Sequence, residues 1–380
     1  MTSIGGAGTS GMVDWNLAVA TATRLVRPGP EVSREEAREV VAELRRHAKA
    51  AEEHVRAYTR MIPEDRDPAD TPDTPVLVVD RTGWIKANVA GFRELLSPLL
   101  DKMQERRSGS TGGTVLSSVG GKVTGVELGM LLSFLASRIL GQYETFAPAG
   151  RDLPADSAGR LLLVAPNIVH VERELDVSPH DFRLWVCLHE ETHRTQFTAV
   201  PWLRDHLQGE IQSFLAATEV DPSTVVERLR EAAQALAGGR PEGEQDEPAP
   251  SLVELVQTPE QREILGRLTA VMSLLEGHAD YVMDGVGPDV VPSVAEIREK
   301  FQQRRARGAS RLDLALRKLL GLDAKLRQYR DGERFVRAVV DQVGMDGFNR
   351  VWTSPNTLPT KAEIAKPADW VARVHRKADS

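Results

Sequence analysis

The pentapeptide HEETH places two histidines four residues apart, with a glutamate directly after the first. On a helix, residues four apart share one face, so His189 and His193 can reach the same metal ion. A zinc ion with three protein ligands keeps a water molecule in its open position. Glu190 would take the proton of that water as general base and later return it to the leaving group. Two partly buried histidines beside surface glutamates are the alternative, because so short a motif also arises by chance.

A second segment, residues 258–285, offers the third ligand. It begins with TPEQ, a capping box that predicts the start of a helix. Its apolar stripe consists of Leu265, Leu268 and Met272. Continuing this stripe in steps of four gives Glu276 and Asp280, which we therefore expect on the buried face, where each needs a cation, a metal or hydrogen-bond donors. Glu276 as zinc ligand would satisfy one, and Asp280 would accept a hydrogen bond from the far ring nitrogen of a liganding histidine. Pairing of Glu276 with an arginine is the alternative.

Four further side chains have a type suited to chemistry. His278 is a candidate ligand, although a histidine in such a position is more often packed and hydrogen-bonded. Tyr329, within the basic segment LRQYRDGE, is a candidate for stabilising an oxyanion, or else lies on a solvated helix. We interpret His206 as structural. Cys187 precedes the first predicted ligand by two residues, which turns it roughly 200° away on a helix, so we exclude it as a ligand.

The element that must carry HEETH has its own start and stop signals. Ser178 is a predicted N-cap, Pro179 suits the first helical position, and Pro201 disfavours helix at the residue before it. The motif is therefore expected near the middle of a helix. Three apolar and aromatic residues precede the histidines on overlapping helical faces: Phe182, Trp185 and Val186. We therefore expect the face that carries the histidines to point inward.

Most of the remaining chain has helical patterning. A long amphipathic helix is predicted after Ser33, and another over residues 88–104. The apolar segment 126–140 contains charged residues and is shorter than the roughly 20 residues that span a bilayer, so it predicts a buried helix. Short runs rich in Val and Leu, in PVLVVDRTGW and in residues 160–172, predict strands, the second a strand or a strand pair. The fold class is therefore mainly α with a small β component.

The predicted organisation has three parts. Residues 1–12 are a Gly/Ser/Thr-rich tail that we expect to be disordered, and residues 13–150 form an N-terminal helical region. Residues 151–380 form the metal-site region and include an acidic Pro/Gly-rich segment, 238–250, which we expect to be a mobile loop. The last two regions are expected to pack as one compact unit.

Composition excludes several classes of partner. The chain has 48 Lys and Arg against 55 Asp and Glu, a net charge of −7 and a pI of about 5.8. These values argue against a nucleic acid or an anionic membrane as the main partner.

The single cysteine and the absence of a basic and apolar leader at the N-terminus predict a cytoplasmic location. The glycines of SVGGKVTG do not have the order of a phosphate-binding loop.

These motifs together carry a resemblance to a known family. HEETH followed by E-x-x-x-D resembles the gluzincin pattern. In that pattern the glutamate, here Glu276, is the third zinc ligand, and the aspartate, here Asp280, supports the site. Two features depart from the pattern: the interval between the motifs is longer than in thermolysin, and Leu275 stands where the family usually has asparagine. More specifically, VAPNIVHVE, DFRLWVCLHEETHRTQF, PWLRDHL, LLEGHAD, GQYE and the C-terminal LPTKAEIAKPADWVARV are similar to actinobacterial zincin-like metallopeptidases, some labelled as associated with deazaflavin coenzyme biosynthesis.

The resemblance implies a zincin-like, mainly helical architecture and a hydrolase with one Zn²⁺ per chain that acts on a peptide or small amide substrate. Two other hypotheses stay open. One is a zinc-containing scaffold without turnover, in which His278 closes the fourth coordination position. The other is a metal-free helical interaction protein, in which Glu276 and Asp280 face basic residues such as Arg304 and Arg305.

Overall fold

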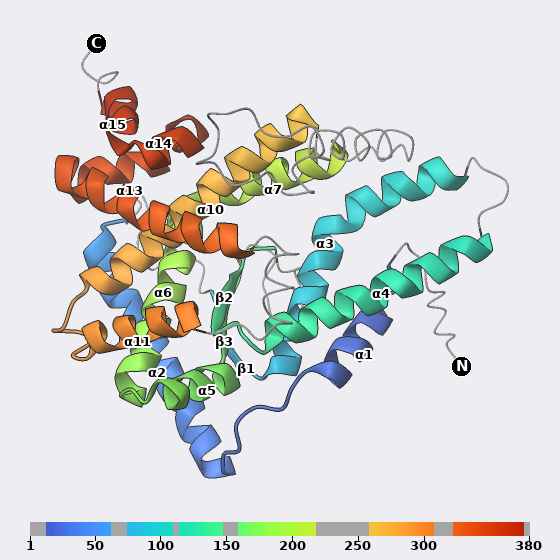
Figure 1. Cartoon of the computed structure of the whole chain (residues 1–380), viewed down its shortest axis with the longest axis horizontal. Coiled ribbons are helices and arrows are strands. Elements are labelled where there is room, and N and C mark those ends of the chain that lie inside the picture. Colours follow the sequence, from blue (N-terminus) through green and yellow to red (C-terminus); the bar gives the residue numbers. More distant parts are fainter. Residues whose placement is uncertain are drawn as a thin grey trace, which may run out of the picture.

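The computed structural model describes residues 13–61, 74–108, 114–146, 159–217, 258–307 and 322–375. The side chains of residues 98–108, 114–123, 305–307 and 322–330 lie outside this description. The tail at residues 1–12 and the loop at 238–250 also lie outside it, so both expectations stay predictions, as does the division into regions. The fold class is confirmed: the described chain is mostly helical, with one small sheet (Figure 1).

The sheet has three strands in the order β1-β3-β2. Strand β1 (Val76–Val79) runs parallel to β3 (Arg160–Val164), and β2 (Gly141–Glu144) is antiparallel to β3. Residues 165–172, predicted as part of a strand or a strand pair, are instead helical: α5 (Ala165–Leu175) begins directly after β3 with proline in its first turn. Proline has no backbone N–H, but the N–H groups in the first turn of a helix have no partner within the helix. Pro166 therefore starts the helix rather than interrupting a strand.

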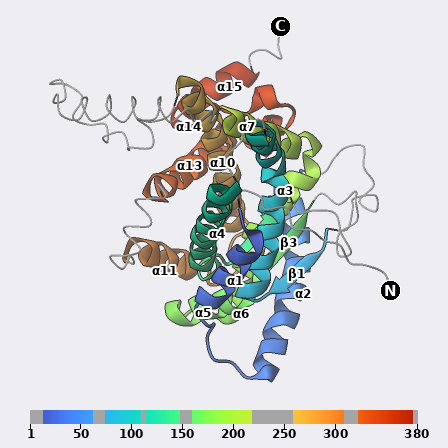
Figure 2. The same cartoon turned by 90° about the vertical axis from the view of Figure 1, so that its right-hand side faces the viewer.

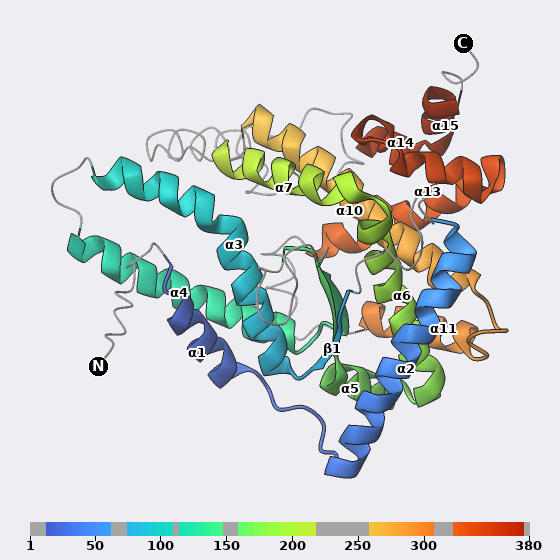
Figure 3. The same cartoon turned by 180° about the vertical axis from the view of Figure 1, so that it is seen from behind.

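Helices cover both faces of the sheet. Alternate strand residues belong to two different apolar clusters, because successive side chains of a strand point to opposite faces. One face packs against α2 (Arg34–Thr59), α5 and α6 (Pro179–Ala199). The other packs against α1 (Trp15–Leu25), α3 (Arg81–Ser108) and α4 (Thr114–Ala136), which Figures 1 and 3 show beside one another. The HEETH helix therefore lies directly on the sheet.

A third apolar cluster forms the C-terminal part of the molecule. Its elements are α7 (Pro201–Ala216), α10 (Pro259–Gly285), α13 (Leu322–Phe348), the 3-10 helices η2 (Asn349–Trp352) and η3 (Pro355–Thr357), α14 (Lys361–Ala365) and α15 (Pro367–His375). Helix α11 (Val294–Arg307) packs near α5 and α6. Figure 2 shows α10, α13 and α15 grouped together, apart from α1 and α5. The helix with the predicted third ligand thus reaches the HEETH helix from this cluster.

Helices α10 and α13 cross at two glycines. A Cβ added to Gly277 would lie 2.1 Å from the backbone carbon of Gly332, and one added to Gly332 would lie 1.9 Å from the carbonyl oxygen of Ser273. No side chain fits at either position, so the two backbones touch. This crossing lies next to Glu276 and holds its part of α10 in place.

The predicted helix starts are confirmed. The Ser33 and Ser178 hydroxyls accept backbone hydrogen bonds at the first turns of α2 and α6, and Thr258 and Gln261 form the capping box of α10. The buried helix predicted at residues 126–140 is wrong in part. Helix α4 ends at Ala136, and it buries one face but leaves Val126 and Met130 exposed. Within the described ranges, no helix has the length and apolar character to cross a bilayer.

Candidate metal centre

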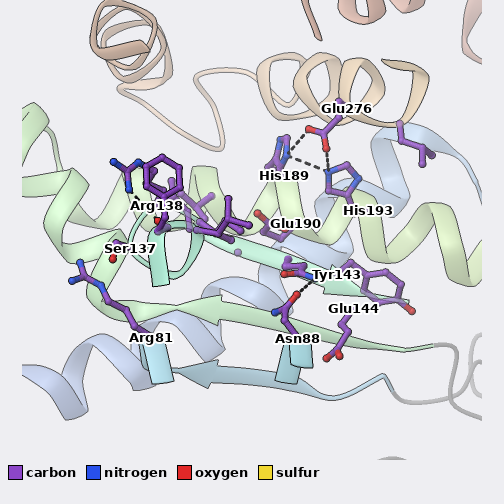
Figure 4. Close-up of a pocket in the computed structure, with 18 of the residues that line it drawn as sticks. Arg81, Asn88, Ser137, Arg138, Tyr143, Glu144, His189, Glu190, His193 and Glu276 are labelled. Carbon is purple, nitrogen blue, oxygen red and sulfur yellow. Dashed lines mark hydrogen bonds and ion pairs between the residues drawn. The ribbon is translucent and has the colours of Figure 1, made fainter. Parts of the chain in front are cut away.

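Helices α6 and α10 bring together the three predicted ligands. The Nε2 atoms of His189 and His193 lie 3.2 Å apart. Glu276 Oε2 lies 3.7 Å from His189 Nε2, and Glu276 Oε1 lies 3.8 Å from His193 Nε2. Figure 4 shows the carboxylate of Glu276 directed at both rings from the facing helix. One potential ligand atom from each residue therefore surrounds a common point.

The far nitrogens of both rings have partners that orient them. Nδ1 of His189 lies 3.6 Å from Asp280 Oδ1 and 3.3 Å from the sulfur of Met283. Nδ1 of His193 lies 3.0 Å from Gln196 Oε1. A proton on each Nδ1 leaves Nε2 with its lone pair toward the shared point, which is the tautomer that a metal ligand needs.

Gln196 has a role that the sequence analysis did not assign. Its side chain is fully buried; its amide nitrogen donates to the Leu275 carbonyl at 3.0 Å and lies 3.0 Å from Nδ1 of His278. It therefore links His193 on α6 to two residues of α10. The sequence feature that could have identified Gln196 is its position three residues after His193, on the same helical face. Many residues share that spacing, so only the fold distinguishes Gln196 from a surface glutamine.

Glu190 lies between the histidines and the edge strand β2 (Figure 4). It is buried, and a Cβ added to Gly141 of β2 would lie 2.5 Å from its Cγ. Burial, and to a lesser degree the neighbouring Glu276 carboxylate, raises the pKa of Glu190 well above its usual range. A carboxyl group with a raised pKa beside the histidines has the proton affinity that a general base requires.

The predicted stripe on α10 faces a cleft rather than the core. Met272 is 42% exposed, and the side chains of Glu276 and Asp280 are each 22% exposed, so the expectation of a buried face is wrong. This face instead lines a large cleft of about 1890 Å³ together with His189 and His193. The buried side of α10 is the one that packs on α6 and α13. The carboxylate of Glu276 therefore lies at the cleft wall, where a ligand can reach it.

Three other candidate residues, His278, Cys187 and His206, are not among the side chains that converge on this centre. His278 is fully buried and stacks on Phe348 at 5.3 Å between ring centroids; burial, then His193, lowers its pKa to about 3. Cys187 is buried with its sulfur near the Leu44 carbonyl. His206 packs against Trp202. The side chain of Tyr329 lies outside the described residues, so its oxyanion role stays a prediction.

The metal-free hypothesis required basic residues opposite the two carboxylates. Arg304 pairs instead with Glu174 at 2.8 Å, and the side chain of Arg305 lies outside the description. Within the described part of the chain, Glu276 forms no ion pair with an arginine or lysine. Among the described residues, the carboxylate of Glu276 is therefore without a lysine or arginine to balance it.

The back of α6 is held by a buried ion-pair network. Nε of Arg194 donates to Glu191 Oε1 at 2.6 Å, Nη1 donates to the Thr74 carbonyl at 3.1 Å, and Nη2 lies 2.5 Å from Glu52 Oε2. Burial, partly offset by Arg194, raises the pKa of Glu191 to about 7. These contacts fix the rotation of α6 between α2 and the segment that precedes β1, and so aim His189 and His193 at the cleft.

The donor set fits a zinc ion. Two nitrogens bound to one zinc at about 2.0–2.1 Å with tetrahedral angles lie roughly 3.3 Å apart. The observed separation of 3.2 Å matches this value. Two imidazoles and one carboxylate are also the set that binds zinc in hydrolases with an open coordination position.

Two comparisons with known proteins bear on this geometry. Residues 13–371 match the family model of zincin-like metallopeptidases. The chain belongs to this family. The zincin-like chain is also similar to a crystal structure from Chloroflexus aurantiacus, described as that of a "putative hydrolase with a novel fold". The two share 32% sequence identity with a TM-score of 0.66, over 96% of this chain and 99% of the other.

No protein in the curated set matches this zincin-like chain. The family membership suggests a zinc hydrolase, and the description of the Chloroflexus aurantiacus structure as a hydrolase is consistent with that. The predicted actinobacterial group and the deazaflavin association are tested by neither comparison and stay predictions.

Proposed function

We propose that this zincin-like protein is a zinc-dependent hydrolase of peptide or small amide bonds. His189, His193 and Glu276 would hold the metal, and Glu190 would act as general base and then as general acid. A zinc ion bound there supplies Lewis acidity and lowers the pKa of a water molecule. One observation carries the proposal: three ligand atoms from two helices converge on one point beside the buried Glu190, and no lysine or arginine of the described residues pairs with Glu276.

The roles of the chain's own residues follow from their positions. Asp280 and Gln196 orient the two imidazoles through their far nitrogens. Glu190 accepts a proton on its carboxylate from the attacking water and delivers it to the leaving amine. Strand β2 lies at the edge of the described sheet and contacts Glu190 through Gly141, so its outer edge borders the place where a substrate must lie.

The volume of the cleft supports an extended substrate rather than a very small one. About 1890 Å³ exceeds the roughly 300–1,000 Å³ of ordinary small-molecule pockets. Apolar side chains line much of it, including Phe134, Phe197, Leu268 and Met272. Such a wall desolvates a bound chain, which strengthens the electrostatic interactions at the metal end.

The test combines elemental metal analysis with an activity screen. Purified wild-type protein is expected to hold about one zinc per chain, and Glu276→Ala to lose it. Wild type is then screened with a peptide library, and Glu190→Gln is expected to keep its zinc but lose turnover by roughly 10²–10⁴-fold. Asp205→Asn, on the exposed side of α7, serves as the matched control. Absence of zinc from wild type after reconstitution would refute the proposal, and so would full activity of Glu190→Gln.

The zinc-containing scaffold without turnover remains the alternative. It required His278 to close the fourth coordination position, and the contacts of this residue speak against that. Its Nδ1 faces Gln196 and its ring stacks on Phe348 and Trp352. The scaffold predicts zinc in wild-type protein without turnover of any peptide in the library.

A further inference from the structure

Helices α6 and α10 pass the candidate metal centre in opposite directions. His189 on α6 lies 3.6 Å from Asp280 on α10. The amide nitrogen of Gln196, two turns later on α6, donates at 3.0 Å to the carbonyl of Leu275, which lies more than one turn earlier on α10. The turn that follows the candidate ligands of α6 therefore lies beside the turn that precedes Glu276 on α10.

These two turns place an apolar pair next to the candidate ligands. Phe197 follows His193 by four residues on α6. Met272 precedes Glu276 by four residues on α10, so each member of the pair shares the helical face of a ligand. Both side chains line the cleft, and Met272 is 42% exposed. The ring of Phe197 stacks on Tyr143 of β2 at 5.5 Å between ring centroids, which holds it in place.

The apolar lining continues between α7 and α10. Arg267 of α10 pairs with Glu210 of α7 at 3.0 Å, so the two helices lie side by side. Neither of these charged residues lines the cleft. The next residue on each helix, Leu268 and Ile211, does line it. Leu268 also precedes Met272 by four residues, so the apolar stripe of α10 extends away from the metal ligands along the cleft.

Helix α3 supplies a further wall. Asn88, Phe92 and Leu95 follow one another at intervals of four and three residues, so they share one face of α3, and all three line the cleft. Phe92 is 36% exposed. Helix α3 also contacts α7. Apolar faces of α3, α7 and α10 therefore border the same part of the cleft.

This part of the cleft has an uncharged lining. Among the described residues that line it, none that belongs to α7, to α10 before Glu276, or to α3 from Asn88 onward is charged. Apolar surface that leaves water contributes favourably to binding, and Phe92 and Met272 are large apolar side chains that the described chain leaves exposed. We call this part the apolar section, formed by Phe92, Leu95, Phe197, Ile211, Leu268 and Met272.

Two side-chain amides within this lining favour a peptide as its occupant. The amide nitrogen of Asn88 donates to the Trp84 carbonyl at 3.0 Å, and that of Gln142 donates to Asn88 Oδ1 at 3.0 Å. Each amide nitrogen carries two N–H groups, and the second of each has no hydrogen-bond partner among the described residues. Both residues line the cleft. Such donors match the carbonyl oxygens of a peptide backbone, whereas an acyl chain would leave them unpaired.

We infer that the apolar section binds a large apolar side chain of a peptide substrate, close to the bond that is cleaved. One helical turn advances about 5.4 Å and an extended peptide about 3.3–3.6 Å per residue, so the pair Phe197 and Met272 lies within about two peptide residues of the metal ligands. This inference rests on the proposed function for the position of that bond. The substrate class is accordingly a peptide with a residue such as leucine or phenylalanine beside the scissile bond.

The test measures binding in Glu190→Gln protein, which leaves peptides uncleaved. The probes are N-acetyl-Gly-Ala-Leu-Phe-Ala-Gly amide and N-acetyl-Gly-Ala-Ser-Ser-Ala-Gly amide, which are both uncharged and equally long. Octanoyl-glycine amide is the acyl probe. Isothermal titration calorimetry is expected to show that the apolar peptide binds at least about tenfold tighter than the polar peptide, because two large side chains leave water. The acyl probe is expected to bind more weakly than the apolar peptide.

Two variants connect this preference to the apolar section. Met272→Gln and Phe92→Gln are each expected to reduce the preference at least about threefold, because both side chains are exposed to the cleft and glutamine is a good helix former. Met130→Gln is the matched control: Met130 is 48% exposed on α4 and does not line the cleft, so the full preference should remain.

Four results would overturn the inference: equal affinity for the two peptides, no binding of any probe, tighter binding of the acyl probe than of the apolar peptide, or an unchanged preference in both variants. None of them would affect the metal analysis. Absence of zinc would refute the proposed function but would leave this binding comparison measurable, so the two proposals fail separately.

Discussion

Two clusters in this zincin-like protein have the same donor types, two histidines and one glutamate. The first is the candidate metal centre, His189, His193 and Glu276, and the second comprises Glu43, His47 and His180 on α2 and α6. Their histidine pairs are also arranged alike, with ring centroids 4.8 and 4.6 Å apart and ring planes at 87° and 74°. Donor type and spacing therefore do not distinguish the two clusters.

Their surroundings do distinguish them. In the second cluster Arg183 donates to Glu43, and His180 lies in the first turn of α6, where the helix dipole is positive. Hydrogen bonds from Arg183 and His180 lower the pKa of Glu43, although its burial acts in the opposite direction. His180 is also 66% exposed. An arginine thus already neutralises the carboxylate of the second cluster, whereas Glu276 pairs with no lysine or arginine among the described residues.

The largest expected effect comes from removing one histidine from each cluster. His193→Ala is expected to lose zinc, because two remaining ligands hold zinc far more weakly than three. His47→Ala is expected to keep about one zinc per chain. Elemental analysis of the two variants after identical dialysis provides the measurement. Zinc loss in His47→Ala with retention in His193→Ala would reverse the assignment of the two clusters.

A smaller effect is expected from Gln196. Gln196→Leu removes the amide oxygen that accepts a hydrogen bond from Nδ1 of His193 and leaves an apolar side chain of similar size in its place. Loss of such an outer partner typically weakens metal binding by about 10–100-fold. Competition with a chromophoric zinc chelator measures the affinity, and Gln208→Leu, in α7, is the matched control. An affinity equal to that of wild type would show that Gln196 does not orient His193.

The smallest effect concerns pH and tests whether His278 stays outside the metal centre. Burial lowers its folded-state pKa to about 3, so its contribution to stability is present above pH 6.5, near the unfolded value, and is lost as pH falls toward 3. The free energy of unfolding of wild type should therefore fall more steeply than that of His278→Asn, by about 1.4 kcal/mol per pH unit below 6. Asparagine keeps an acceptor for Gln196.

Urea unfolding at pH 7, 6 and 5 in the presence of a chelator provides the measurement. The chelator keeps both proteins metal-free, so protonation of the zinc ligands contributes equally to both. His170→Asn, at an exposed site on α5, should have the wild-type slope. Parallel pH profiles for wild type and His278→Asn would contradict a buried neutral imidazole.

Much of the candidate site was predictable because helix periodicity is local. HEETH and the stripe that leads to Glu276 and Asp280 identify the same residues that the structure brings together, since spacings of four place residues on one helical face whatever the tertiary contacts. The cap signals at Ser33, Ser178 and Thr258 were equally local, and each begins a helix in the structure.

Other features depended on contacts between distant segments. Residues 165–172 combine apolar residues with a proline, a pattern that suits a strand pair or a strand followed by a helix, and packing on the sheet selected the helix. The stripe on α10 was expected in the core, but it lines the cleft because α6 and α13 pack on its other sides. Hydrophobic periodicity shows that one face of a helix is apolar. It does not show which part of the molecule that face contacts.

The local elements and the residue types of the candidate metal centre follow from the sequence alone. Only the fold shows that Glu276, unlike Glu43, has no lysine or arginine partner among the described residues, that Gln196 holds His193, and that Gly141 lies against Glu190. It also places Phe92 in the same cleft as the histidines. The reason is physical: spacing along one helix follows from its backbone geometry, whereas burial and charge balance depend on segments far apart in the chain.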